Sequence, residues 1–415
     1  MVKEHFNAGV AVVKRLVDAG HTAYFAGGWV RDFQMKIPSD DIDIATSASP
    51  QEVASLFEKT IPVGINFGVM IVVHNEHPFE VATFRTDRAY IDGRRPIGVD
   101  PATPEEDATR RDFTINGMFY DPLNELLYDY VEGKTDIADG VIRAIGNPEM
   151  RFAEDRLRMM RAVRYAARFH FIIEHATLEA IVEHAPELLN AVAIERIWQE
   201  FDKMARFPHF DIALITMHRL GLLQIIFPEL STLTIETLEE RAHFMVHFPV
   251  GTPTVVYLLE LFPHFTSNDI IALCDRFKVS NKIKDFALAF HAHVKRFYIG
   301  TQLDDYQWAK TYSCPFFEIS FQITSLKKPP QDQAAFIKMH EERQARLQQN
   351  IERLREQKPI LRARDLEKAG IAPGKSMGLL LQEGEALSIN EQLSSPDTII
   401  EKLRTSSNWP NEDST

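Results

Sequence analysis

The chain changes character near Asn147-Pro148. Before this point, short runs rich in β-branched and aromatic residues alternate with amphipathic helical patterns. From Met150 onward the pattern is helical almost to the end, with no convincing strand after Ile145. Strands segregated from helices in this way are typical of an α+β architecture. We therefore predict an N-terminal domain with a mixed sheet and helices, followed by an all-helical remainder.

The length of 415 residues allows two to four domains. We place the α/β domain at residues 1–148 and divide the helical remainder into residues 149–210, 211–326 and 327–415. The last division falls at Lys327-Lys328-Pro329-Pro330, where two prolines interrupt the helical pattern. The polar residues from Ser406 onward are expected to form a disordered tail.

Two aspartates, Asp41 and Asp43, lie one residue apart in a segment predicted to form a strand over residues 41–45. Side chains alternate faces along a strand, so both carboxylates are expected to point the same way. Adjacent carboxylates repel each other unless a cation lies between them, and Mg²⁺ usually takes one or two protein carboxylates together with substrate phosphates. An isolated Asp-x-Asp is a weak signal, because acidic residues at strand ends are often solvated or act as caps.

A glycine turn, Gly27-Gly28-Trp29-Val30-Arg31-Asp32, lies just upstream of these aspartates. The glycines let the backbone approach a phosphate closely, and the helix start that follows offers free N–H groups to an anion. Gly-Gly alone is only a turn signal. The turn and the aspartate pair, in this order and spacing, predict a site for phosphoryl or nucleotidyl transfer.

A third carboxylate, Glu80, lies on the second strand of a hairpin predicted for Val69–His74 and Phe79–Phe84. If this strand neighbours the two aspartates, Glu80 joins them as a catalytic carboxylate. From the spacing alone, a solvated strand residue fits equally well.

Residues 86–110 are rich in charges, Gly and Pro and are expected to form a long mobile loop that leads into a helix over Phe113–Tyr120. The junction carries the polar cluster Arg110-Arg111-Asp112-Phe113-Thr114-Ile115-Asn116. The planar fork of arginine suits phosphate and sugar contacts. Asp112 and Asn116 could instead only cap the helix.

Six arginines and no lysine mark the segment after the domain boundary: Arg151, Arg156, Arg158, Arg161, Arg164 and Arg168. On one helix the last four fall within an arc of ~120°. A run of charge is usually a solvated helix face, but arginine without lysine favours recognition of a polyanion or a base. Arg161 and Arg164 are therefore candidate nucleotide-binding residues.

Asp155 and Arg158 are three residues apart, so on a single helix they lie side by side. A carboxylate accepts from an exocyclic amine and a guanidinium donates to a ring nitrogen. A fixed pair would therefore accept the Watson–Crick edges of cytosine and adenine and reject those of guanine and uracil. An ordinary salt bridge is the alternative interpretation.

The net charge of −13 and the pI of about 5.6 argue, as global averages, against a nucleic-acid partner, although a local basic stripe decides such a question. The N-terminal segment has no signal-peptide character, and no apolar run approaches membrane-spanning length. The two cysteines, Cys274 and Cys314, have no metal-ligand spacing. We expect a cytoplasmic protein with no membrane partner and no obligate protein partner.

Together these motifs resemble the class II tRNA nucleotidyltransferases of the bacterial type, the CCA-adding enzymes. The resemblance rests on the glycine turn, the Asp-x-Asp and the Arg-Arg-Asp cluster, and it covers roughly residues 22–208. Three further segments match the family: a hinge from Gly133 to Arg143, Glu154–Ala162 and Ile194–Glu200. In the remainder only Gly370–Gly374 resembles a family motif.

The resemblance implies a DNA-polymerase-β-like nucleotidyltransferase head followed by an all-α neck, body and tRNA-binding tail. It implies that Asp41 and Asp43 hold two Mg²⁺ ions. The resemblance also implies that Gly27, Gly28, Arg31 and Asp32 line the triphosphate site, and that Arg111, Asp112 and Asn116 recognise the ribose 2′-hydroxyl.

It implies that Asp155 and Arg158 select CTP and then ATP, and that Glu195 and Arg196 support the helix that carries this pair. The loop 86–100 would be the mobile element for the change from C to A.

The implied reaction is the addition of C, C and A to the 3′ end of tRNA from CTP and ATP. The tRNA 3′-hydroxyl attacks the α-phosphate and pyrophosphate leaves. An A-adding enzyme or a bacterial poly(A) polymerase shares the same motifs and stays open as an alternative. The long loop argues against a CC-only enzyme. A catalytically inactive tRNA-binding protein is a hypothesis of a different class, which the intact Asp41, Asp43, Arg111, Asp155 and Arg158 disfavour.

Overall fold

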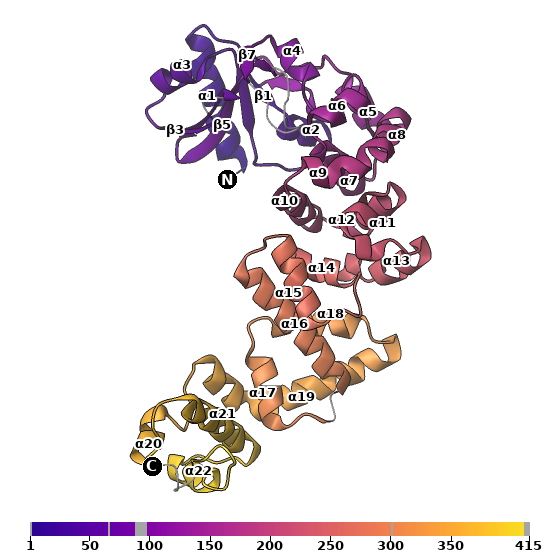
Figure 1. The fold of residues 1–415 in the computed structure, drawn as a ribbon. Helices are drawn as coiled ribbons and strands as arrows, with labels where there is room; N and C mark the ends of the chain where they lie inside the picture. The colour runs from indigo at the N-terminus through magenta and orange to yellow at the C-terminus, as the bar shows by residue number, and fades with distance from the viewer. Residues whose placement is uncertain (1, 65–66, 88–97, 300–301, 411–415) are drawn as a thin grey trace. The chain divides into compact units, whose positions relative to one another are not determined.

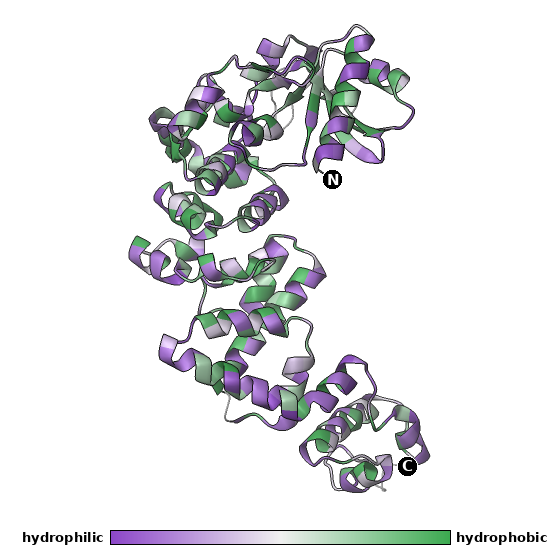
Figure 2. Ribbon diagram, turned by 180° about the vertical axis from the view of Figure 1, so that it is seen from behind, coloured by the Kyte–Doolittle hydropathy of each residue, from purple (hydrophilic) through white to green (hydrophobic). Residues whose placement is uncertain are grey.

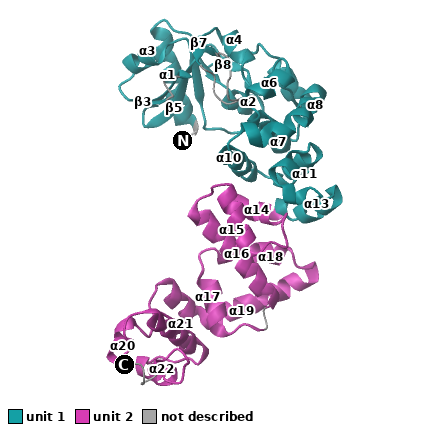
Figure 3. Ribbon diagram, viewed as in Figure 1, with its two compact units in different colours: residues 1–246 teal, residues 247–415 magenta. Residues whose placement is uncertain are grey.

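The structure is a computed structural model that describes residues 2–64, 67–87, 98–299 and 302–410 (Figure 1). The chain divides into two compact units, Met1–Val246 and His247–Thr415, coloured separately in Figure 3. The finer division into four domains stays a prediction.

A seven-stranded mixed sheet forms the centre of the N-terminal region, with the strand order β3-β4-β5-β2-β1-β8-β9. Strands β2 and β5 pair in parallel, and the other neighbouring strands pair antiparallel. Its strands are β1 Ala23–Ala26, β2 Asp43–Thr46, β3 Thr60–Gly64, β4 Val69–His74, β5 His77–Thr83, β8 Phe119–Asp121 and β9 Leu126–Tyr128. The predicted hairpin of β4 and β5 is confirmed.

Helix α1 (Val2–Asp18) packs its apolar side against this sheet, where Val12 and Leu16 join the same core as Phe25, Ile44 and Phe79. Short helices α2 (Gly28–Gln34) and α3 (Pro50–Leu56) follow β1 and β2 along the chain. A capping box formed by Ser49 and Glu52, with Pro50 at the first position, starts α3. Helix α1 covers a face of the sheet but not the ends of β1 and β2 that carry Ala26 and Asp43, so a site can form at those ends.

Two local expectations in this region are wrong. Strand β2 begins at Asp43, so Asp41 lies before the strand and its direction is not set by strand alternation. The segment expected to be one helix over 113–120 is a 3₁₀ turn, Thr114–Asn116, followed by strand β8. Gly117 weakens a helix at this point, and the next residues gain backbone bonds to β1 instead.

The expected loop over residues 86–110 is also wrong in its described part. Arg85–Asp87 (β6) pairs with Val99–Pro101 (β7), and Pro104–Thr109 forms helix α4 behind a capping box of Thr103 and Glu106. Residues 88–97, which hold most of the predicted mobile element, lie outside the described residues.

The rest of the first unit is helical apart from a two-residue parallel pairing of β10 (Val141–Ile142) with β11 (Ile172–Ile173). The expectation of no strand after Ile145 is therefore wrong, because β10 pairs with a short strand, β11, that lies within the helical region. The helices are α5 Gly133–Asp139, α6 Pro148–Glu154, α7 Leu157–Phe169, α8 His175–His184, α9 Leu188–Ala191, α10 Ile194–Ala205, α11 Phe210–Arg219, α12 Leu222–Ile226 and α13 Ile235–Ala242.

The second unit is helical throughout its described residues. Figure 2 shows hydrophobic and hydrophilic residues alternating along its helices, as expected for amphipathic packing. The predicted break at 327–330 is confirmed, since α18 ends at Leu326 and α19 begins at Pro330. The helices are α14 Thr254–Leu259, α15 Ser267–Arg276, α16 Asn281–Ile299, α17 Asp305–Ser313, α18 Phe317–Leu326, α19 Pro330–Arg355, α20 Ala363–Lys368, α21 Lys375–Asn390 and α22 Pro396–Leu403.

The expected disordered tail is wrong for residues 406–410. Trp409 packs against the core between α20, α21 and α22, and Ser406 donates a hydrogen bond to Glu383 Oε2 at 2.6 Å. In the described part of the chain, no helix is both long and apolar enough to cross a membrane.

Two histidines are buried in the core of the second unit. His340, fully buried, receives a hydrogen bond on Nδ1 from the Tyr312 hydroxyl at 2.8 Å, and its Nε2 has no hydrogen-bond partner among the described residues. His293 shares a 3.0 Å hydrogen bond with Ser320 Oγ. Burial lowers the pKa of each to about 4, with Arg343 and Lys328 adding to the effect at His340 and Arg296 at His293.

Acid should destabilise the second unit through these histidines. In the unfolded chain these histidines are protonated below pH ~6.5, whereas in the folded chain they stay neutral down to about pH 4. The free energy of unfolding therefore keeps its full value above pH ~6.5 and falls as the pH drops from ~6.5 to about 4. We expect a loss of up to roughly 3 kcal/mol per histidine. Urea unfolding at pH 7, 6, 5 and 4.5 measures it.

His340→Gln should remove about half of that pH dependence, because glutamine does not titrate. His264→Gln, at an exposed position of the same unit, serves as the control and should keep the dependence of the unsubstituted protein. Identical pH profiles for His340→Gln and the unsubstituted protein would contradict the assignment.

Candidate functional site

A cleft of about 710 Å³ opens between the sheet and helices α7 and α10, within the first unit. Ten arginine and lysine side chains line it against five carboxylates, in a chain whose net charge is −13. The chain therefore concentrates positive charge here. The lining residues are Gly27, Gly28, Arg31, Asp41, Asp43, Arg110, Arg111, Asp112, Asn116, Asp155, Leu157, Arg158, Arg161, Arg164, Tyr165, Arg168, Arg196, Gln199, Glu200, Lys203, Arg206 and Phe207.

Gly27 forms the turn at the floor of the cleft. Its φ of +67° lies in the left-handed region that favours glycine. A Cβ atom at this position would lie 3.2 Å from Arg111 Nη1 and 3.8 Å from Asp43 Oδ2. The turn therefore places backbone against both the basic and the acidic part of the site.

Three carboxylates converge beside this turn. Asp43, the first residue of β2, is in register with Glu80 of the parallel strand β5, one of the two placements that the sequence left open, and Asp41 lies two residues earlier. Burial raises the pKa of Asp43 to about 7, helped by Glu80 and Asp41 and opposed by Arg111. Burial and Asp41 likewise raise the pKa of Glu80, against Arg85.

Such mutual repulsion fits a site that takes a cation between Asp41 and Asp43, since both line the cleft. Glu80 instead lines a smaller adjoining cavity of about 180 Å³, together with Asp43 and Arg111. Among the described residues, no group of three His, Cys, Asp or Glu side chains is arranged to hold a metal ion by itself. The geometry therefore suits a cation that takes other ligands from a bound phosphate.

The Arg110-Arg111 pair is held from behind by Asp107 of α4, which is 1% exposed. Arg110 Nε donates to Asp107 Oδ1 at 2.9 Å, and Arg111 Nη2 donates to Asp107 Oδ2 at 2.9 Å. The Arg85 backbone N–H donates to the same carboxylate at 3.2 Å. Asp107 has no counterpart in the predicted site, although its spacing of three and four from the arginines is a helical signal.

Asp112 and Asn116 are buried beside the pair, and they do more than cap a helix. Asn116 Nδ2 donates to Asp112 Oδ1 at 3.0 Å, and Asn116 Oδ1 accepts from Arg31 Nη1 at 2.5 Å. Arg161 of α7 donates through Nε to Asp112 Oδ2 at 2.7 Å. Burial opposes ionisation of Asp112, but Arg161, Asn116 and Arg158 outweigh it and hold its pKa well below the usual range.

Asp32, predicted to line the triphosphate site, lies behind the cleft and does not line it. Its Oδ1 accepts from Arg31 Nη2 at 2.6 Å, and its Oδ2 accepts from Arg168 Nη2 at 3.1 Å. The carboxylate is buried, so it holds two arginines that do line the cleft in place.

The arginine run is not a solvated helix face. Each of the six arginines pairs with a carboxylate, and Arg164, whose Nε lies 2.7 Å from Glu200 Oε2, is buried. The partners are Glu154 for Arg151 and Arg158, Glu187 for Arg156, Asp112 for Arg161, Glu200 for Arg164 and Asp32 for Arg168.

Tyr165 is a residue that the sequence reasoning missed. Its ring lies 4.2 Å from the Arg164 guanidinium carbon and 5.0 Å from that of Arg31, and its hydroxyl accepts from Arg161 Nη2 at 3.1 Å. The aromatic face attracts cations, so it eases the crowding of like charges. Its place between the arginines of α7 was the available signal.

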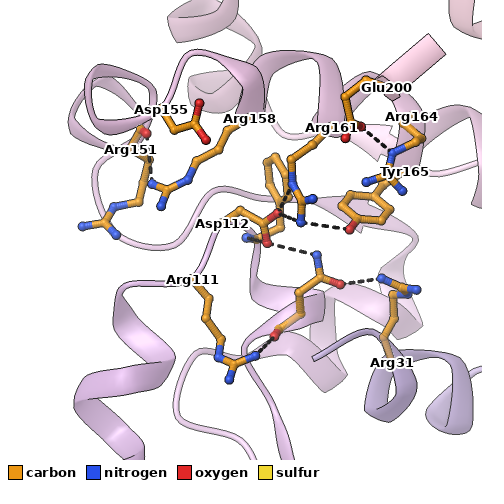
Figure 4. A network of polar contacts seen from close by, with 12 residues as sticks. Arg31, Arg111, Asp112, Arg151, Asp155, Arg158, Arg161, Arg164, Tyr165 and Glu200 are labelled. Atoms are coloured by element: carbon orange, nitrogen blue, oxygen red, sulfur yellow. Dashed lines mark hydrogen bonds and ion pairs between the residues drawn. The ribbon is translucent and has the colours of Figure 1, made fainter. Parts of the chain in front are cut away.

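Asp155 and Arg158 do not form the side-by-side helical pair that was expected. Helix α6 ends at Glu154 and α7 starts at Leu157, so Asp155 lies between the two helices, with an extended backbone. Its carboxylate accepts from Arg196 Nη2 at 2.7 Å and from the Leu157 N–H at 3.0 Å, while Arg158 Nη1 donates to Glu154 Oε2 at 2.6 Å. Figure 4 draws both side chains as neighbours with no bond between them.

The simple salt-bridge interpretation is therefore wrong. Each member of the pair is held by a different partner, and both line the cleft. Helix α10 and the residue after it line the cleft with Arg196, which was expected to support the selecting helix, and with Lys203 and Arg206, which the prediction missed. Their spacing of seven and three residues is the helical signal that reveals one basic face.

Residues 23–143 match the family model described as the poly(A) polymerase head domain, and residues 170–233 match a probable RNA- and SrmB-binding site of polymerase A. A CCA-adding enzyme of Bacillus velezensis is 45% identical over 224 residues, which are 54% of this chain and 56% of that protein. The alignment thus spans about half the length of that curated relative.

A solved structure of the Bacillus stearothermophilus CCA-adding enzyme in complex with CTP matches with a TM-score of 0.81 and 27% identity, over 97% of this chain and 98% of that one. The chain is a relative of the bacterial CCA-adding enzymes. Its predicted α+β fold class and its predicted resemblance to the class II tRNA nucleotidyltransferases are confirmed. This family of nucleotidyltransferases generally uses a divalent metal.

A Thermotoga maritima CCA-adding enzyme complexed with tRNA has the same fold, with a TM-score of 0.62 and 19% identity over 96% of this chain and 94% of that one. At this identity the likeness concerns the fold alone.

Asp107→Asn should loosen the Arg110-Arg111 pair. The substitution removes the charge that both guanidinium groups share, so we expect a loss of about 2 kcal/mol in the free energy of unfolding and weaker binding of inorganic tripolyphosphate. Urea unfolding and calorimetric titration measure the two effects.

Glu106→Gln is the matched control on the same helix, because glutamine keeps the capping box with Thr103 and makes no contact with the arginines. The control should bind tripolyphosphate as the unsubstituted protein does. If Asp107→Asn and Glu106→Gln bound tripolyphosphate with equal affinity, Asp107 would have no role in positioning the arginines for anion binding.

Proposed function

We propose that this chain adds C, C and A to the 3′ end of tRNA, using CTP and ATP. The tRNA 3′-hydroxyl attacks the α-phosphate of the nucleotide and pyrophosphate leaves. One observation carries the proposal: the carboxylates Asp41 and Asp43 share one cationic cleft with Asp155 and Arg158. The relationship to CCA-adding enzymes over about half of the chain supports it.

The triphosphate would lie against the backbone of Gly27 and Gly28 and the guanidinium of Arg31. The free N–H groups at the start of α2 and the fixed charge of Arg31 suit an anion. Asp32 would position Arg31 without touching the nucleotide. Lys203 and Arg206 extend the positive wall of the cleft.

The ribose would contact Arg111, Asp112 and Asn116, which combine a donor, an acceptor and an amide in one buried cluster. The base would meet Asp155 and Arg158, an acceptor and a donor held apart by different partners. That arrangement matches the amine and ring nitrogen of cytosine and adenine. Arg161 and Arg164 would hold this wall of the site together.

Asp41 and Asp43 would hold two Mg²⁺ ions, with Glu80 beside them as a third catalytic carboxylate. When bound there, Mg²⁺ would lower the pKa of the attacking hydroxyl and neutralise charge on the phosphates. The chain's own part is to orient the triphosphate against Gly27 and to keep the base in register with Asp155.

The RNA partner would be tRNA. The match of residues 170–233 to a probable RNA-binding segment supports an RNA substrate, and a structure of the same fold contains tRNA. We further propose that the protein acts in the cytoplasm, where its two free cysteines would stay reduced. An A-adding enzyme or a poly(A) polymerase remains the alternative within the same chemistry.

Extension of three tRNA transcripts, ending at the discriminator base, at C and at CC, tests the proposal with CTP, ATP or both and Mg²⁺. Addition of C, C and A followed by a stop supports it. A single A added only to the CC transcript indicates an A-adding enzyme, and a long A ladder indicates a poly(A) polymerase. No extension of any transcript by a folded protein that still binds tRNA would favour an inactive binding protein.

Asp41→Asn should abolish extension while tRNA binding, measured by filter retention, stays close to normal. The substitution removes one of two charges that would hold the metal but leaves the basic cleft intact. Asp40→Asn, one residue earlier and outside the cleft lining, is the control and should keep activity. Full extension by Asp41→Asn would contradict the metal assignment.

Asp155→Asn should relax base selection, because an amide offers a donor as well as an acceptor and so tolerates the carbonyl of uracil and guanine. We expect the preference for CTP over UTP to fall by about tenfold or more. Single-turnover extension with each nucleotide measures it. Asp202→Asn on α10, a carboxylate outside the cleft lining, should leave the preference unchanged.

A further inference from the structure

Four N–H-bearing nitrogens crowd the Asp112 carboxylate, three through hydrogen bonds and one through an ion-pair contact. Oδ1 accepts from the Phe113 N–H at 2.8 Å and from Asn116 Nδ2 at 3.0 Å. Oδ2 accepts from Arg161 Nε at 2.7 Å and lies 2.5 Å from Arg161 Nη2. A carboxylate offers about four lone-pair positions, so a further hydroxyl can bind only by replacing one of these donors.

Two of the four donors belong to the same turn as Asp112 and cannot readily leave. The Phe113 N–H is the next backbone group, and Asn116 is fixed from its other side because Arg31 Nη1 donates to its Oδ1 at 2.5 Å. These bonds hold Oδ1 in place from within the head. A hydroxyl that replaces one of the donors must therefore do so at Oδ2.

Arg161 reaches Oδ2 from α7, 49 positions further along the chain. Its fork can give up one bond and keep the other, so the buried carboxylate stays paired throughout. Arg161 Nη2 also donates to the Tyr165 hydroxyl at 3.1 Å, so the arm that leaves Oδ2 stays anchored by its second N–H (Figure 4). The exchange thus keeps the carboxylate and the guanidinium paired through Nε.

We propose that Arg161 is a positioning residue for ribose selection: it holds Asp112 from the neck helix α7 and yields one position on Oδ2 to the 2′-hydroxyl of an incoming ribonucleotide. This inference rests on the proposed contact between Asp112 and the ribose. A deoxyribonucleotide brings no donor for Oδ2 and gains nothing from the exchange. Sugar selection by the head then depends on a residue outside it.

Arg161→Lys tests the proposal, since a single ammonium keeps the charge but cannot release one arm while holding the carboxylate with the other. We expect the ratio of CTP to dCTP affinity to fall by about tenfold, in equilibrium titrations without tRNA and in kcat/KM for extension. Arg161→Gln, which also loses the charge, should lower the ratio at least as far.

Arg164→Lys is the matched control. It lies on the same helix three residues later and is likewise ion-paired, although it is buried while Arg161 is partly exposed, and it contacts Glu200 and Tyr165 instead of Asp112. It should weaken the binding of CTP and dCTP alike and leave their ratio unchanged. A general loosening of α7 would instead lower the ratio in both variants, which would overturn the proposal.

Asp112→Asn separates this inference from the proposed function. If Asp112→Asn lowers the ratio and Arg161→Lys does not, at a temperature where circular dichroism shows both folded, Arg161 has no part in sugar selection. If Asp112→Asn leaves the ratio unchanged, Asp112 does not read the ribose and the inference fails with its premise. If the proposal holds, the variant that combines Asp112→Asn with Arg161→Lys has the same ratio of CTP to dCTP affinity as Asp112→Asn alone, because Arg161 acts only through that carboxylate.

Binding of CTP over dCTP that depends on Arg161, in a protein that extends no tRNA, would support this inference while the proposed transfer reaction fails.

Discussion

The architecture of the cleft depends on buried ion pairs that hold arginines of one helix against carboxylates of other elements. Arg161, Arg164 and Arg168 of α7 would repel one another in a low-dielectric wall if they stood alone. Asp112 and Asp32 come to them from the N-terminal domain, and Glu200, 1% exposed, comes from α10. Together these pairs hold α7 against the turn of Asp112, against α2 and against α10.

Base selection requires an acceptor and a donor that remain separate until a base arrives. An Asp155–Arg158 salt bridge would satisfy both groups internally, and a base would have to break it. The break between α6 and α7 prevents this, because Asp155 turns to Arg196 while Arg158 turns to Glu154. In the proposed function, the edge of a base would meet groups whose orientation is already fixed, so less ordering would accompany its binding.

The sequence predicted the elements that local chemistry determines. The glycine turn at Gly27, with its positive φ, and the hairpin that carries Glu80 follow from residue type and spacing. It did not predict what tertiary pairing decides. Strand β8 forms because β1 offers an edge, and Asp155 leaves the helix because Arg196 and the Leu157 N–H bind its carboxylate. Asp107 was missed because its spacing from Arg110 and Arg111 is a signal only if the segment is helical, and this segment was expected to be a loop.

The acidity of the chain and its basic cleft are compatible because electrostatic attraction acts over short distances in salt. At physiological ionic strength the screening length is ~8 Å, so a phosphate in the cleft senses the lining far more than the rest of the surface. A net charge of −13 makes most other approaches of a polyanion unfavourable. Excess acid elsewhere therefore directs a polyanion to the one cleft where ten basic side chains face five carboxylates among the described residues.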